Sequence, residues 1–344
     1  MEKTPIDARA LHERCVVFDA HSDFLSDVVP KRKQGRTGVI EEDWVPVMRA
    51  GGIDTRLATI FVDHAHVPDF ALRDGLDTAV ALHKEVEESP SVVRIETFEE
   101  IEKGKQDRRI GLILGMEGAE PLGNDLELLR AFRILGLRLL TLTHALRNYC
   151  ADGVHFFPQR EGTIGGLTDF GVKVVEECNE LGIVVDVSHL NETGFWDVLK
   201  FTKAPLVASH SNCRALMDHP RCLTDEQIKA LIASGGVIGM NAASIFVDAE
   251  KPDLDHFVNH IDHIMDLGGE KNIGLGFDFC DYALKYLDPD TVAKLPNVAP
   301  VEGLCGDQDV PNLTQVLVER GYSEEQIELI LGKNMLRVFK EVWK

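Results

Sequence analysis

The stretch IGLILGMEGAEPLGNDLELLRAFRILGLRLLTLTH, residues 110–144, is the part of the chain from which the fold is most easily inferred. Its first seven residues are apolar or Gly, which is typical of a strand buried on both faces. Asp125, a favourable helix N-cap, then opens a stretch of helical periodicity that ends at Leu135. A second apolar run, Leu137–Thr143, follows directly. This order predicts a strand, a crossover helix and a parallel strand.

The same alternation continues in both directions along the chain. We predict eight strands, at Cys15–Asp19, Ile53–Val62, Ile110–Met116, Leu137–Thr143, Gly182–Ser188, Pro205–Ser209, Gly236–Asn241 and Ile273–Phe277. Helices are predicted at Asp69–Glu88, Asp125–Leu135, Asp169–Leu181, Asn191–Phe201, Thr224–Ala233 and Leu254–Leu267. This α/β pattern predicts a (β/α)8 TIM barrel with a C-terminal helical tail from about Pro311 to Trp343. A doubly wound open sheet is the alternative.

The remaining segments do not require a second domain. Lys31–Pro46, basic and then acidic, and Tyr282–Asp309, rich in Pro and Asp, are expected to be long loops over one barrel face. The sequence shows no internal repeat of fixed period and no low-complexity tract. We therefore predict that residues 1–344 form a single barrel domain.

Composition and charge restrict the function. The chain has 344 residues, 44% hydrophobic, and a formal net charge of -21, which opposes binding to nucleic acid or to an anionic membrane. No window approaches the roughly 18 apolar residues of a membrane helix, and the first residues, MEKTPIDARALHERC, lack the apolar core of a signal peptide. The seven cysteines form no CxxC pair, which is typical of reduced thiols. A cytoplasmic protein acting on small molecules is expected.

Side chains that can bind metal stand at or just after the ends of six predicted strands. They are His21, Asp23, Glu117, His144, His189, His210 and Asp278. In a barrel, the carboxyl ends of the strands meet at one face, where the active sites of this fold are built. We therefore expect these side chains to converge on one site.

This set of side chains favours a binuclear metal site. His21 and Asp23 are two residues apart on an extended segment and point to the same side. Imidazole and carboxylate ligands without thiolate favour zinc, with manganese, iron or cobalt as alternatives. Five candidate ligands suggest two ions, and Glu117 on a central strand is the natural bridge between them. Such a pair generates hydroxide at neutral pH, so the expected reaction is hydrolysis.

The whole set also resembles a known family. The set His21-x-Asp23, Glu117-Gly118, His144, His189, His210, Arg221 and Asp278 is similar to that of the membrane (renal) dipeptidases, binuclear zinc enzymes of the amidohydrolase superfamily. The resemblance extends from DAHSD to the tail GKNMLRVFKEV and includes LRLLTLTH and RCLTDEQI. The chain departs from the usual family pattern at Ser22, Cys222 and Cys280.

The resemblance implies a zinc-dependent dipeptidase, a metallopeptidase that hydrolyses dipeptides, including those with a D-residue at the C-terminal position. His21 and Asp23 would hold one zinc, His189 and His210 the other, and Glu117 would bridge them, with a hydroxide between the ions. The resemblance also makes a homodimer the expected assembly.

The family resemblance also assigns three residues to the reaction itself. His144 would bind and polarise the scissile carbonyl, and Arg221 would bind the substrate's C-terminal carboxylate. Asp278 would accept the proton of the bridging water and pass it to the leaving amine.

Two other functions are compatible with the residues. An N-acyl amino acid hydrolase, or another amide hydrolase, could use the same metal pair, and the requirement for a free substrate amine would distinguish it from a dipeptidase. A non-catalytic metal-binding or scaffold protein is the third hypothesis, although such a protein would not need Asp278 as a proton shuttle. The sequence contains neither a GxxxxGK[ST] phosphate loop nor a GxSxG nucleophile motif.

Overall fold

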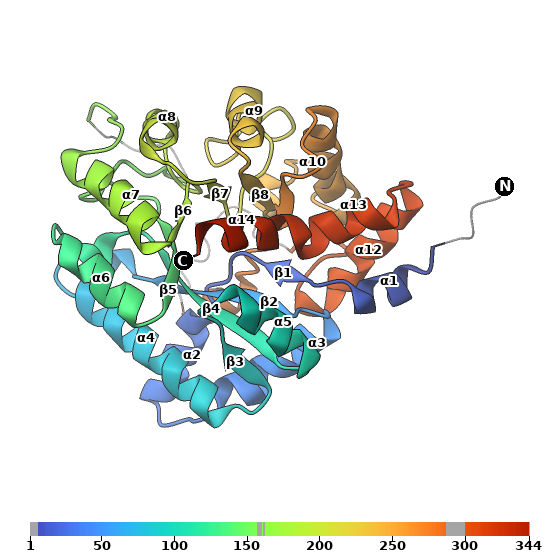
Figure 1. The fold of residues 1–344 in the computed structure, drawn as a ribbon, viewed down its shortest axis with the longest axis horizontal. Helices are drawn as coiled ribbons and strands as arrows, with labels where there is room; N and C mark the ends of the chain where they lie inside the picture. Colours follow the sequence, from blue (N-terminus) through green and yellow to red (C-terminus); the bar gives the residue numbers. More distant parts are fainter. Residues whose placement is uncertain (1–5, 157–159, 161, 287–299, 344) are drawn as a thin grey trace.

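The structure, a computed structural model, describes residues 6–156, 160, 162–286 and 300–343. Its centre is a closed parallel barrel (Figure 1) of β1 (Phe18–Asp19), β2 (Thr55–Phe61), β4 (Ile110–Glu117), β5 (Leu137–Thr141), β6 (Val184–Asp186), β7 (Val207–Ala208), β8 (Val237–Met240) and β9 (Ile273–Leu275). Each strand pairs with the next in this order, and β9 closes the ring by pairing with β1. The eight predicted strands and the barrel are confirmed, and the open sheet is excluded.

The six predicted helices are confirmed and surround the barrel (Figure 1). They are α4 (Ala71–Glu88), α6 (Leu126–Ile134), α7 (Asp169–Leu181), α8 (Glu192–Phe201), α9 (Asp225–Ala233) and α10 (Leu254–Asp266). Five of them begin after a polar side chain that accepts a hydrogen bond from a backbone N–H of the first turn. These N-caps are Asp125, Thr168, Asn191, Thr224 and Asp253.

The prediction that Lys31–Pro46 forms a loop is wrong. The segment contains the end of α2 (Leu25–Lys33), a π-helical turn (Ile40–Trp44) and the start of α3 (Val45–Ala50). Its charges pair with one another, because Lys31 Nζ lies 2.7 Å from Asp43 Oδ2 and Arg36 Nη1 lies 2.8 Å from the same oxygen. These ion pairs stabilise the helical turns of the segment. The order of basic and then acidic residues in the sequence did not show that they would pair in this way.

Three further elements were not predicted. Helix α1 (Ala8–Arg14) precedes the barrel, β3 (Val92–Arg94) pairs with the start of β4, and α5 (Phe98–Gln106) follows β3. Helix α5 begins with a capping box between Thr97 and Glu100, a signal that is visible in the sequence.

The second predicted loop, Tyr282–Asp309, is described only in part. It includes 3₁₀ turns at Asp281–Tyr286 and Asp307–Asp309, whereas residues 287–299 lie outside the described residues.

The predicted helical tail closes the amino end of the barrel. It contains α12 (Val310–Glu319), α13 (Glu324–Glu328), a π-helical turn (Leu329–Lys333) and α14 (Asn334–Val342), and α14 crosses the front of the strand ring in Figure 1. Met335, Val338 and Phe339 of α14 join the cluster inside the barrel. The inward-facing strand residues in this cluster are Phe18, Leu57, Ile113, Leu139, Val184, Val207 and Val237. The interior is therefore packed, and the chemistry is left to the carboxyl end.

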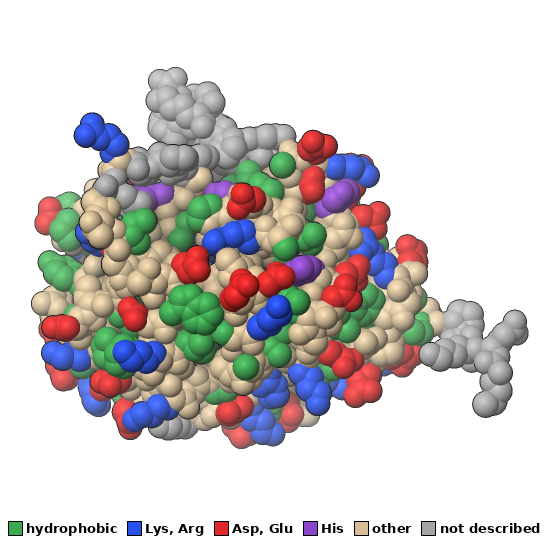
Figure 2. All heavy atoms as spheres, turned by 90° about the horizontal axis from the view of Figure 1, so that it is seen from above, with side chains coloured by type: hydrophobic (Ala, Val, Ile, Leu, Met, Phe, Trp, Pro, Cys, Tyr) green, Lys and Arg blue, Asp and Glu red, His purple; other side chains and the backbone are tan. Residues whose placement is uncertain are grey.

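The surface has no large area of a single charge sign on the face that Figure 2 shows, where acidic and basic side chains are interspersed. Within the part of the chain that the structure describes, no helix is both long enough and apolar enough to cross a membrane.

Candidate metal centre and active site

Three histidines converge on one oxygen of Glu117 at the carboxyl end of the barrel. Glu117 Oε1 lies 3.0 Å from His189 Nε2, 3.3 Å from His210 Nε2 and 3.6 Å from His21 Nε2. His21 Nε2 also lies 3.4 Å from Asp23 Oδ2 and 3.7 Å from Asp278 Oδ1. The fold thus brings together the candidate ligands from four strand ends, with Glu117 in the middle.

The backbone at this face is unusual where it presents two of these side chains. His189 and Asp278 follow β6 and β9 and adopt φ values of 65° and 56°, a region that non-glycine residues seldom adopt. Gly276, just before Asp278, approaches β7 so closely that an added Cβ would lie 1.8 Å from the carbonyl oxygen of Ser209. A strained backbone and a close approach of strands are common features of functional sites.

A hydrogen-bond chain behind His210 determines which of its ring nitrogens carries the proton. The carboxylate of Asp186 accepts from Ser209 Oγ at 2.5 Å and from Thr141 Oγ1 at 2.6 Å. The hydroxyl proton of Ser209 is therefore directed at Asp186, and Ser209 Oγ accepts from His210 Nδ1 at 2.7 Å. His210 then carries its proton on Nδ1, so a lone pair on Nε2 faces Glu117, as a metal ligand requires.

Burial and neighbouring charges both shift the pKa values of this cluster. Burial lowers the pKa of His189 and of His210 well below the ordinary value, so both rings are neutral. For His21, burial is outweighed by Asp23 and Glu117, which raise its pKa to about 10. Burial, together with Asp23, raises the pKa of Glu117 well above its ordinary value.

These features fit a bound cation. The site has two neutral imidazoles, those of His189 and His210, whose Nε2 atoms face Glu117. It also has three carboxylates whose mutual repulsion a positive charge would relieve. Asp23 Oδ1 and Glu117 Oε2 are buried without a hydrogen-bond partner. Three groups of possible ligand atoms overlap here, two of them through Glu117: His21, Glu117 and His210; Glu117, His144 and His189; and His21, Asp23 and Asp278. The donors are those that divalent transition metals prefer.

Arg221 is buried beside this cluster. Arg221 is 4% exposed, its Nη2 donates to the carbonyl oxygen of His210 at 3.1 Å, and its guanidinium lies over the ring of Phe246. Within the described residues, Arg221 forms no ion pair with a carboxylate, and its Nε has no hydrogen-bond partner. Burial lowers its pKa. A buried guanidinium of this kind is prepared to bind an anion.

Asp278 and His144 complete the predicted set. Asn241 Nδ2 donates to Asp278 Oδ2 at 3.0 Å, which leaves Oδ1 toward His21. Burial raises the pKa of Asp278 to about 6, against the opposing effect of His21. The His144 ring packs 4.4 Å from the His189 ring, measured between centroids, and keeps part of its surface accessible.

Three residues of the site were not predicted from the sequence: Asn241, Asp186 and His64. His64 Nε2 lies 2.9 Å from His144 Nδ1. All three stand at or near the carboxyl end of a strand, so the rule that identified the other candidates would also have found them.

The closed barrel with histidines and carboxylates at its carboxyl end defines a metal-dependent hydrolase. The chain belongs to the membrane dipeptidase family, peptidase family M19, which matches residues 6–344. It is thus a metallopeptidase of the dipeptidase type, and its family implies a metal cofactor. The recognition of this family from the sequence is confirmed.

Individual relatives agree with this assignment. The chain is 34% identical over 252 residues to an uncharacterised protein in the pqqA 5′ region of Klebsiella pneumoniae, covering 71% of this chain and 87% of the relative. It is 33% identical over 235 residues to dipeptidase verJ of Clonostachys rogersoniana, covering 68% of this chain and 56% of that protein's length.

A solved structure extends the similarity to the whole fold. A metallopeptidase from Rhodobacter sphaeroides, bound to a phosphinate mimic of the dipeptide L-Ala-D-Ala, matches with a TM-score of 0.83 and 28% identity. The match covers 96% of this chain and 99% of the other.

Proposed function

We propose that this protein hydrolyses the peptide bond of dipeptides at a site that holds two zinc ions. The observation that carries the proposal is the position of Arg221, a buried guanidinium without a carboxylate partner in the described part of the chain, beside the cluster around Glu117. A free dipeptide has a carboxylate close to its single peptide bond. Arg221 would hold this carboxylate while the bond lies over the metal centre.

The proposed ligands follow from the distances around Glu117. His21 and Asp23 would hold one ion and His189 and His210 the other, with Glu117 as the bridge. The support is that the imidazole nitrogens of all three histidines lie within 3.6 Å of the same Glu117 oxygen. When bound, the metal pair supplies a hydroxide at neutral pH and polarises the substrate carbonyl.

The chain's own residues would orient the substrate and move the proton. His144 donates a hydrogen bond to the carbonyl oxygen as negative charge develops there. Asp278 Oδ1 accepts the proton of the attacking water and delivers it to the leaving amine as the C–N bond breaks. Asn241 holds the other oxygen of Asp278. A dipeptide and one water thus give two free amino acids.

Two further properties stay predictions. We propose a homodimer, which size-exclusion chromatography with light scattering would test. A cytoplasmic location is also proposed, and it is consistent with the seven cysteines all being free in the structure.

The experiment that tests the function is a dipeptide screen with zinc-reconstituted protein, read out as released amino acids. The screen includes L-L and L-D stereoisomers, N-acylated amino acids and dipeptide amides. Hydrolysis confined to free dipeptides supports the proposal. Preferred cleavage of N-acylated amino acids would instead identify an acyl-amino-acid hydrolase, and no turnover with two bound ions would support a metal-binding protein.

A further inference from the structure

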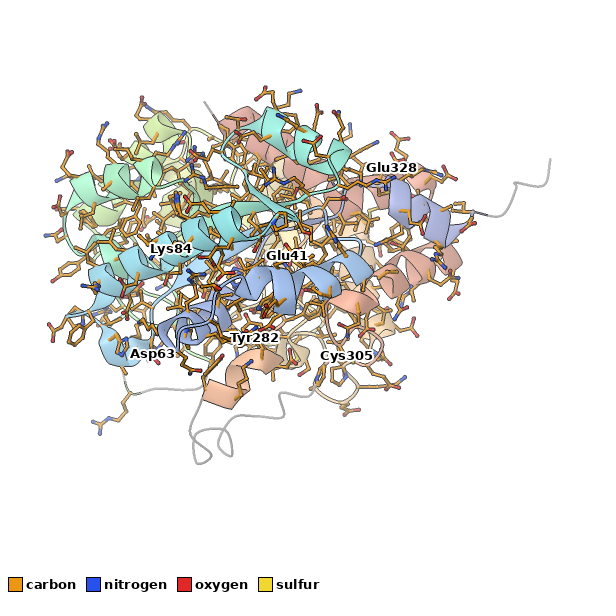
Figure 3. The ribbon with its side chains drawn as sticks, turned by 90° about the horizontal axis from the view of Figure 1, so that it is seen from below. Glu41, Asp63, Lys84, Tyr282, Cys305 and Glu328 are labelled. Atoms are coloured by element: carbon orange, nitrogen blue, oxygen red, sulfur yellow. The ribbon has the colours of Figure 1, made fainter. Side chains whose placement is uncertain are left out.

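His64 is a histidine beside the active site to which neither the family resemblance nor the proposed reaction assigns a role. It opens the 3₁₀ turn His64–His66, which follows β2. Asp63 caps this turn, because its side chain accepts a hydrogen bond from the backbone N–H of Ala65 at 2.8 Å. Figure 3 labels Asp63 near the same edge of the molecule as Tyr282 and Cys305. The capped turn places His64 at the mouth of the barrel.

This position brings two imidazoles together. His64 Nε2 lies 2.9 Å from His144 Nδ1, a hydrogen-bond distance between residues 80 positions apart in the sequence. Phe61 and Phe156 pack edge-on against the His144 ring, with centroids 4.9 Å and 5.3 Å away. Among the described residues, His64 is the one hydrogen-bond partner of a His144 nitrogen, so the tautomer of His144 is linked to the direction of this hydrogen bond.

The direction of this hydrogen bond follows from proton counting. A hydrogen bond between two ring nitrogens 2.9 Å apart requires a proton on one of them and a lone pair on the other. For a neutral His144 to donate to a carbonyl oxygen from Nε2, its Nδ1 must be unprotonated and must accept a hydrogen bond. His64 Nε2–H is the available donor.

We propose that His64 is a positioning residue that donates its Nε2–H to His144 Nδ1 and so holds His144 in the tautomer with its proton on Nε2. The inference rests on the proposed function, in which His144 donates to the substrate carbonyl. His64 itself is not a catalytic residue, because it acts through His144 and needs no contact with the reacting atoms.

The test compares two replacements of His64 with a matched control in the same turn. His64→Gln keeps an N–H donor of similar reach, and His64→Leu removes it. His66→Leu is the control, because the His66 side chain is 52% exposed and pairs with Asp74 rather than with His144. All variants are studied as full-length, zinc-loaded protein.

We expect His64→Leu to lower kcat about 10- to 100-fold, and we take as a guide the loss found when a hydrogen-bond partner of a metal-binding histidine is removed. KM should change by less than about threefold, because the substrate carboxylate is held by Arg221. His64→Gln should recover most of kcat, and His66→Leu should match the parent protein. Metal content should be the same in every variant.

A second readout needs no substrate. Nitrogen-15 NMR of labelled protein reports which nitrogen of His144 carries the proton, and we expect Nε2–H in the parent and in His64→Gln, and a mixture of tautomers in His64→Leu. An unchanged tautomer in His64→Leu would overturn the proposal. So would metal loss in that variant, which would place His64 in the metal site. If no dipeptide is cleaved, the NMR result still decides the role of His64.

Discussion

Glu117 is the residue through which the two halves of the proposed metal site are coupled. Its Oε1 is the oxygen that the imidazoles of His21, His189 and His210 approach, and Glu117 is 3% exposed. A carboxylate in this position would balance part of the charge of two cations. Glutamine at this position has the same shape but no charge.

We therefore predict that Glu117→Gln loses at least one of two bound ions per chain and nearly all hydrolytic activity. Elemental analysis after zinc reconstitution measures the ions, and a dipeptide assay measures turnover. A parent protein with full activity and a single ion would refute the binuclear site. Full activity in Glu117→Gln would show that another residue bridges.

Replacing Arg221 tests substrate recognition separately from the hydrolytic reaction. Arg221→Met should weaken dipeptide hydrolysis by about 2–5 kcal/mol in kcat/KM, the cost of leaving a buried charge without its partner. A dipeptide amide lacks the carboxylate, so it should be a poor substrate of the parent and lose little more in the variant. Metal content should not change. Equal losses on both substrates would contradict the proposed carboxylate contact.

Elements distant in the sequence are joined by a buried ion cluster beneath the site. Arg56 of β2 donates from Nε to Asp19 Oδ2 of β1 at 2.8 Å and from Nη1 to Asp307 Oδ2 at 2.8 Å. Arg56 is 1% exposed. This cluster attaches the turn at Asp307–Asp309 to the first two strands, and β1 leads directly into His21.

Arg56→Met should destabilise the protein by about 3–5 kcal/mol, because it leaves two carboxylates close together and unpaired in the interior. Urea unfolding followed by circular dichroism measures the loss. The matched control is Arg73→Met, which removes an exposed pair with Asp77 and should cost no more than about 0.5 kcal/mol. Similar losses in both variants would argue against the buried cluster as a stabilising link.

Asp43 lies in the segment Lys31–Pro46, which was predicted to be a loop and is partly helical. Its ion pair should stabilise the folded protein against unfolding by acid. Hydrogen bonds from Arg36 lower the pKa of Asp43 to about 2, against the effect of burial. A carboxyl whose pKa is lowered in the folded state stabilises it above the unfolded pKa, about 3.9, and this stabilisation disappears as the pH falls toward 2.

We predict that the parent is more stable than Asp43→Asn above pH ~4, by about 1 kcal/mol because the partly exposed pair is screened. The difference should vanish near pH ~2. Urea midpoints of both proteins between these pH values measure it. A constant difference across this range would mean that Asp43 does not titrate as stated.

At the scale of the whole molecule, the barrel has a packed amino end and a polar carboxyl end. Removing the metal should leave Asp23, Glu117 and Asp278 repelling one another at the polar end. Chelation should therefore lower the melting temperature by about 5 °C or more, since a ligand at 1,000 times its Kd stabilises by about 4 kcal/mol. Differential scanning calorimetry measures the change, and added zinc should reverse it. In Glu117→Gln, chelation should have a smaller effect.

The amino-acid sequence by itself determined the barrel and the chemistry of its carboxyl end. Apolar period, N-caps and strand ends are properties of short segments, so eight strands and six helices could be located without knowledge of their neighbours. Four of the proposed metal ligands could be predicted because a parallel barrel places its strand ends at one face. They are His21, Glu117, His189 and His210. The single domain over residues 1–344 stays a prediction from the same pattern.

Only the tertiary structure decided which side chains meet. Three features depend on contacts outside the short periodic patterns. They are the helical segment around Lys31, the ion cluster of Arg56 with Asp307, and the pairing of His64 with His144. Arg56 and Asp307 are 251 positions apart, and His64 and His144 are 80 apart. Their side chains come within hydrogen-bond distance because the barrel closes and its loops are packed in one arrangement. The periodicity of a short segment contains no information about which distant side chains will come into contact. Once such side chains are in contact and buried, their hydrogen bonds are strengthened and their pKa values shift.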